Sequence, residues 1–128
     1  MILFLTSSPC VIDAPRAILN PANGFVARLR QSLPQWPRVL VISSNPEDHD
    51  GTCGFANDMS ATLAEYGMPV GGFQVLDGTN AELAEYLVAT SDLIIIMGGH
   101  VPTQNAFFSR LKLKERLENY RGIVLAWS

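Results

Sequence analysis

Four short segments of this 128-residue chain are apolar at consecutive positions rather than at alternating ones. They are residues 2–5, 39–42, 93–97 and 123–127, and residues 73–76 form a weaker fifth segment. Continuous apolarity over four or five residues is typical of strands covered on both faces, as in parallel sheets. The pattern therefore predicts five strands in one parallel sheet, with 93–97 and 123–127 as central neighbours.

Segments with helical spacing separate these strands. Apolar residues recur every four positions in residues 25–33 and 55–63, and residues 83–87 and 107–120 also carry helical patterns. Gly67 stands where a C-terminal helix cap belongs. Regular alternation of strand and helix predicts an α/β fold, a doubly wound, mainly parallel sheet with helices on both faces. We expect a single domain over residues 1–128.

The composition narrows the classes of partner and compartment. The net charge is −3, and 48% of the residues are hydrophobic, enough for a sizeable core. The chain has no basic run, so we expect no nucleic-acid partner and no membrane partner. Residues 1–6 are apolar but too short for a signal-peptide core or a membrane span. Cys10 and Cys53 form no disulfide framework, which favours the cytoplasm.

Two candidate site segments follow the two central strands. Gly98 and Gly99 come directly after residues 93–97, and Ser128 follows residues 123–127. A glycine pair lets the backbone approach a ligand and turn its N–H groups toward an anion, although it also suits a plain tight turn. A serine at a strand tip is where α/β hydrolases hold their nucleophile, although a solvated turn is the simpler interpretation. Together they predict a nucleophile beside oxyanion donors, as acyl transfer requires.

Other polar positions give weaker indications. Residues 47–51, which include His49, are acidic and suggest a metal loop, but Met59 occupies the twelfth position from Asp48, where a calcium EF-hand has glutamate. A solvated loop is therefore favoured, within a long connection over residues 43–54. Cys10 and Cys53 are interpreted as ordinary small residues rather than nucleophiles. Neither GxGxxG nor GxxxxGK[ST] occurs, and we expect no cofactor and no metal.

Several segments resemble the serine peptidases of the dipeptidase E and cyanophycinase type, which have the class I glutamine amidotransferase-like fold. Residues 91–99 (SDLIIIMGG) resemble the strand and glycine-rich turn of that family, and residues 121–128 (RGIVLAWS) resemble the strand that enters its G-x-S-x-G nucleophile elbow. Residues 61–67 (ATLAEYG) match its helix–strand rhythm less specifically. Ala126 replaces the first glycine of the elbow, a small change.

The resemblance implies specific roles. Ser128 matches the nucleophile, and Gly98 and Gly99 match the turn that binds the oxyanion. His100 belongs to the same turn, in place of a third glycine that is common in the family. The polar stretch after the turn, residues 101–105, adds Gln104 and Asn105 as further oxyanion-binding or substrate-binding residues. The catalytic histidine and its acidic partner are expected after residue 128.

These observations predict a cytoplasmic serine-type hydrolase that cleaves small peptides or peptide-like amides through an acyl-enzyme on Ser128. Because a strand such as 123–127 normally runs on into a covering helix, we expect the polypeptide to continue beyond Ser128 and the fold to be incomplete there. The oligomeric state stays open, with a homodimer among the alternatives. The alternative functions are a non-catalytic binding module or inactive homologue on the same fold and, less favoured, a flavodoxin-like domain.

Overall fold

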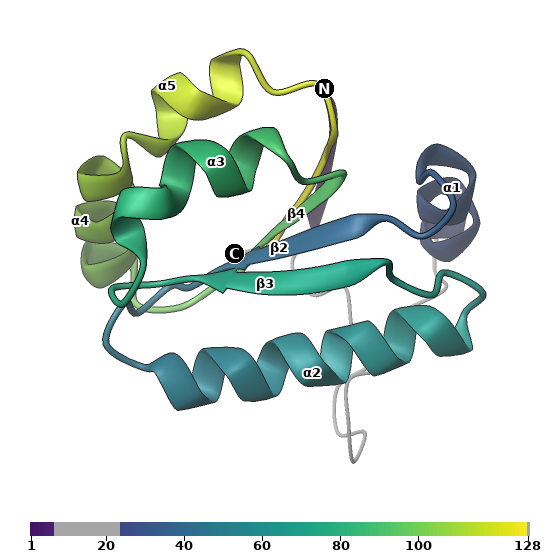
Figure 1. Ribbon diagram of the computed structural model, residues 1–128, viewed down its shortest axis with the longest axis horizontal. Helices are drawn as coiled ribbons and strands as arrows, with labels where there is room; N and C mark the ends of the chain where they lie inside the picture. The colour runs from purple at the N-terminus through teal and green to yellow at the C-terminus, as the bar shows by residue number, and fades with distance from the viewer. Residues whose placement is uncertain (7–23, 128) are drawn as a thin grey trace.

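The computed structural model describes residues 1–6 and 24–127, and its strands and helices alternate along the chain (Figure 1). Within these residues, none of the helices combines the length and the apolar character needed to cross a membrane. The elements are β1 Ile2–Thr6, α1 Phe25–Ser32, β2 Arg38–Ile42, α2 His49–Glu65, β3 Gly72–Leu76, the 3₁₀ helix η2 Ala81–Leu83, α3 Ala84–Ala89, β4 Leu93–Ile96, α4 Val101–Leu111, α5 Leu113–Glu118 and β5 Ile123–Trp127.

The five strands form one parallel sheet in the order β1-β5-β4-β2-β3. Strand β4 lies between β2 and β5, so that Ile96 pairs with Ile42 on one side and with Ala126 on the other. The predicted parallel sheet and the predicted neighbourhood of β4 and β5 are confirmed. Because every strand runs in the same direction, the residues that follow the strands gather at one edge of the sheet, its carboxyl edge.

Side chains on the two faces of the sheet build two separate cores. Val39 and Val41 of β2 face the layer that contains α1 and α2, whereas Leu40 and Ile42 face α3, α4 and α5. Figure 1 shows α2 below the sheet and α3 and α5 above it. The alternation follows from the two-residue period of a strand. The α/β fold class with helices on both faces is therefore confirmed as a three-layer sandwich.

The two-sided covering predicted for residues 2–5 is wrong. Strand β1 lies at an edge of the sheet and pairs with β5. Ile2 and Leu3 are each 48% exposed, and Leu5 is 75% exposed. A continuous apolar run identifies a strand, but the burial of that strand depends on its position in the sheet. Strand β1 lies at an edge, next to β5, and not in the centre.

Two helices begin earlier than the sequence suggests. Helix α2 begins at His49, so the predicted long connection over residues 43–54 contains its first turns. Asp48 caps this helix, because its Oδ1 accepts a hydrogen bond from the Gly51 N–H at 3.1 Å. The same helix ends at Glu65, and Gly67, two residues later, has the φ of 82° expected of the predicted C-terminal cap. The Met68 N–H then donates to the Leu63 carbonyl at 2.8 Å and closes the cap.

The second early helix is α4, whose first residues are 101–105 rather than a polar turn before a helix. His100 is its N-cap residue, and Pro102 suits the first turn because the N–H that proline lacks has no partner there. The helix predicted over residues 107–120 is divided into α4 and α5 at Lys112, which has a φ of 52°. A left-handed residue cannot continue an α-helix, so the chain changes direction there.

Candidate functional site

The carboxyl edge of the sheet brings together residues that follow β2, β3 and β4. The Ser43 N–H donates to the Leu76 carbonyl at 3.0 Å, and the Met97 N–H donates to the Ile42 carbonyl at 3.3 Å. These bonds extend the strand pairing by one residue on each side of β2. Open α/β sheets place their ligands at this edge, so it is the natural location for a site.

Gly99 lies directly against Ser44, which follows β2. A Cβ added to Gly99 would come within 2.5 Å of the Ser44 Oγ and 2.8 Å of its Cβ. The φ of Gly99 lies outside the left-handed region. Close approach of two strand ends, rather than an unusual backbone angle, therefore requires glycine at this position. Sequence reasoning did not identify Ser44; its position directly after a predicted strand was the available signal.

The residues after Gly99 are engaged in shaping the turn. The His100 ring accepts a hydrogen bond at Nδ1 from the Thr103 N–H at 3.4 Å and lies 2.8 Å from the Thr103 Oγ1. Gln104 donates from Nε2 to the Met97 carbonyl at 2.5 Å, which ties the helix to the start of the turn. Asn105 is exposed on α4. His100 and Gln104 thus hold the turn in place, and the contacts of these two side chains are with the protein itself.

Ser128 lies outside the described residues, so its side chain is not part of the observed geometry. The residues around it in the sequence are informative. Strand β5 extends to Trp127, and Ala126 pairs with Ile96 of β4. The chain therefore enters position 128 from the strand next to the one that enters Gly98 and Gly99.

A cavity of about 530 Å³ opens at the same edge, between the loop after β2 and α4. Glu47 and Arg110 bring charges of opposite sign to its lining, and Phe107 contributes an apolar surface. Its other lining residues are Asn45, Pro46, Thr103 and Ala106. This cavity adjoins the turn through Asn45, the neighbour of Ser44, and through Thr103, the partner of His100.

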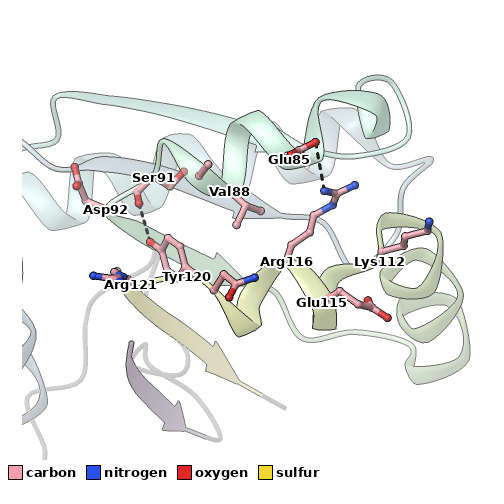
Figure 2. A pocket seen from close by; sticks show the side chains of 12 residues that line it. Glu85, Val88, Ser91, Asp92, Lys112, Glu115, Arg116, Tyr120 and Arg121 are labelled. Carbon is pink, nitrogen blue, oxygen red and sulfur yellow. Dashed lines mark hydrogen bonds and ion pairs between the residues drawn. The ribbon is translucent and has the colours of Figure 1, made fainter.

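A second cavity, of about 830 Å³, lies between α3 and α5 at the opposite end of the strands (Figure 2). It is lined by the residues that directly precede β4 and β5, including Asp92 and Arg121. Tyr120 donates from its hydroxyl to the Ser91 carbonyl at 2.9 Å. Burial, together with nearby Asp92, raises the pKa of Tyr120 to about 12. This cavity lies at the amino edge of the sheet, whereas open α/β sheets bind their ligands at the carboxyl edge.

The carboxyl edge also holds a buried carboxylate that sequence reasoning missed. Asp77 directly follows β3 and is fully buried. Its Oδ1 accepts hydrogen bonds from the Thr79 N–H at 2.9 Å and the Thr79 hydroxyl at 2.6 Å. Its Oδ2 lies 2.5 Å from Nδ1 of His49, the first residue of α2. Residues 47–51 are exposed, as predicted for a solvated segment, but the predicted loop is wrong from His49 on, because α2 begins there and the His49 ring contacts a buried acid.

The two groups shift each other's pKa values. The hydrogen bond and the negative charge of Asp77 raise the pKa of His49 above 6.5, with a smaller contribution from Asp50. Burial alone would raise the pKa of Asp77, but the hydrogen bonds from Thr79 and His49 outweigh it and lower the pKa below 3.8. At pH values between these two, the pair is an imidazolium and a carboxylate.

Comparisons with known proteins add no assignment. No protein-family model matches the chain, and no curated protein matches it. The resemblance to the dipeptidase E and cyanophycinase type therefore stays a prediction.

Within residues 1–6 and 24–127, no three His, Cys, Asp or Glu side chains are grouped as metal ligands.

Proposed function

We propose that the protein is a serine-type hydrolase that cleaves small peptides or peptide-like amides. Ser128 attacks the carbonyl carbon of the scissile amide and forms an acyl-enzyme, which water then hydrolyses. Backbone N–H groups of the Gly98–Gly99 turn stabilise the negative oxygen of the tetrahedral intermediate. The resemblance assigns the general base to a histidine after residue 128.

The observation that carries this proposal is the pairing of β4 with β5 at the carboxyl edge. Acyl transfer needs a nucleophile and oxyanion donors within a few ångströms of the same carbonyl group. Neighbouring parallel strands end about 5 Å apart, which suits that requirement. Ser128 follows one of these strands, and the glycine turn follows the other.

Helix α4 provides further support for a site that stabilises negative charge. It begins at Val101, directly after the turn, and therefore directs its N-terminal end toward the carboxyl edge. The aligned peptide dipoles place a partial positive charge at that end, which stabilises an anion close to it. The hydrogen bond from Gln104 to the Met97 carbonyl fixes the helix relative to the turn, so the donors need little reorganisation during the reaction.

The cavity next to the turn suits a small peptide. Arg110 and Glu47 both line it, and Phe107 provides an apolar contact. A free peptide carries a carboxylate and an ammonium group, which these two side chains complement. We propose this cavity as the binding site for the substrate, a small peptide bound without a metal or cofactor by a cytoplasmic enzyme.

The test compares hydrolysis by two serine variants of the complete protein. A panel of fluorogenic aminoacyl and dipeptidyl amides serves as substrate. Ser128→Ala should lower kcat by at least about a thousandfold without changing the melting temperature. Ser109→Ala, a matched change at an exposed position of α4, should leave kcat unchanged. Turnover by Ser128→Ala at the wild-type rate excludes the proposal, and a folded wild-type protein with no turnover favours a binding module instead.

A further inference from the structure

A thiol, an imidazole and a carboxylate lie next to one another at the N-terminal end of α2. They belong to Cys53, His49 and Asp77. The Cys53 Sγ lies 3.4 Å from Nε2 of His49, and the Nδ1 of the same ring lies 2.5 Å from Oδ2 of Asp77. The Sγ is farther from Nδ1, at 3.9 Å. The Sγ therefore lies against the ring, closer to the nitrogen that does not contact the acid. This is the order of groups that activates a nucleophile through a base held by an acid.

Local structure holds the three side chains in this arrangement. His49 and Cys53 are four residues apart on α2 and thus share one face of the helix. Asp77 is fixed by the two hydrogen bonds from Thr79 to its other oxygen. The loops that carry the acid and the helix are also joined, because the Gly78 N–H donates to the Pro46 carbonyl at 2.9 Å.

The electrostatic surroundings favour a positive imidazole beside the sulfur. Asp77, from the turn after β3, and Asp50, from the same helix, both raise the pKa of His49. A proton that leaves the Sγ is therefore held well on Nε2. The His49 side chain is 52% exposed and Cys53 is half-buried, so a small reagent in solution can reach the sulfur.

We propose that Cys53 is a nucleophilic thiol and a site of covalent modification by small disulfides, with His49 as its proton acceptor and Asp77 as the group that positions His49. The Sγ proton moves to Nε2, and the thiolate attacks one sulfur of the reagent RSSR. A Cys53–SR bond forms as the S–S bond breaks, and the departing RS⁻ takes the proton to become RSH. The Cys53 sulfur is oxidised to the disulfide level, and the departing sulfur is reduced to a thiol.

The experiment measures the rate at which dithiobis(nitrobenzoate) reacts with Cys53, in a Cys10→Ser background and with the modified peptide identified by mass spectrometry. An ordinary thiol is only a few per cent thiolate at pH 7, so an activated one reacts roughly tenfold faster or more. In the folded protein with His49 intact, Cys53 should therefore react roughly tenfold faster or more than in the same protein unfolded in denaturant. His49→Gln should remove the advantage, whereas Asn57→Gln, at an exposed position of the same helix, should keep it.

The pH profile separates activation from a merely structural role. With His49 present, the rate should change little around neutral pH, and in His49→Gln it should rise steeply as pH increases. A structural role for His49 predicts the opposite change in rate, because loosening the start of α2 exposes Cys53 and speeds the reaction. Asp77→Asn should slow the modification of Cys53 toward the rate of His49→Gln. Because a substitution at the buried Asp77 can also affect folding, the result for His49→Gln, at an exposed position, decides between the two roles. An unchanged rate and profile in His49→Gln overturns the proposal.

Discussion

His49 and Asp77 are in contact across 2.5 Å, although 28 residues separate them in the sequence. The contact joins the first residue of α2 to the residue that follows β3, at the carboxyl edge of the sheet. An exposed imidazole thereby acquires a buried, hydrogen-bonded counter-charge.

This pair predicts a specific dependence of stability on pH. The pKa of His49 is raised in the folded protein. Its contribution to the free energy of unfolding is therefore complete below pH 6.5 and is lost as pH rises through the pKa of the folded state. The pKa of Asp77 is lowered, so its contribution is complete above pH 3.8 and is lost as pH falls through the lower folded value. His49→Gln should therefore destabilise the protein most between pH 3.8 and 6.5.

Urea unfolding of the wild type and of His49→Gln across this range measures the effect. The difference between their midpoints should shrink as the solution becomes alkaline. His100→Gln provides the matched control, because the partner of that ring is Thr103. A difference that is constant with pH, or that grows on the alkaline side, contradicts the ion pair.

The central strands provide a second prediction, on folding. Ile95 of β4 is fully buried between the two helical layers. Ile95→Asp places an unpaired charge there at a cost of several kcal/mol, comparable with the roughly 5–15 kcal/mol that stabilises a typical domain. The variant should be unfolded by circular dichroism.

Phe73→Asp is the control for this substitution, because Phe73 is on β3 and is 38% exposed. It should remain folded with a loss of about 1 kcal/mol. A folded Ile95→Asp protein with the wild-type melting temperature is incompatible with the position of β4 in the sheet.

The contact between Gly99 and Ser44 gives the third prediction. Gly99→Ala brings a Cβ into the Ser44 side chain and should cost about 1–3 kcal/mol, as overpacking does. Ser44→Gly in the same chain removes both contacts and should restore most of that loss. Gly54→Ala, on an exposed face of α2 with open space around it, should instead stabilise the protein by about 0.5–1 kcal/mol.

Catalysis should follow the same pattern if the turn supplies the oxyanion donors. Displacing them in Gly99→Ala should lower kcat by about two orders of magnitude, and Ser44→Gly should recover it. Denaturant midpoints and kcat are measured on the same preparations. Normal kcat in folded Gly99→Ala would falsify the role of the turn.

The strands could be predicted from the sequence because a strand that is covered on both faces has consecutive apolar residues. Residues 123–127 became β5 at the predicted bounds. The order of the strands leaves no such record, which is why the exposure of Leu5 on β1 was missed. The first turns of α2 were missed because they are polar, although Asp48 is a typical N-cap residue.

The candidate site was predictable only in part. Glycines directly after a strand indicate a turn that can bind a ligand. In the structure, the close contact with Ser44 explains why position 99 requires glycine. The pair of His49 and Asp77 depends on the register of β2 and β3, which brings distant segments together. The signal that was available is that Asp77 directly follows a predicted strand, at the edge where parallel sheets gather functional residues.

The central claim is that Ser128 is an activated nucleophile, and covalent labelling tests it most directly. The complete protein is treated with a fluorophosphonate, which reacts with the serine of serine hydrolases, and the labelled peptide is sequenced by mass spectrometry. We expect stoichiometric modification at Ser128, none in Ser128→Ala and normal labelling in Ser109→Ala. A folded protein that stays unlabelled, or that is labelled at another serine, contradicts it.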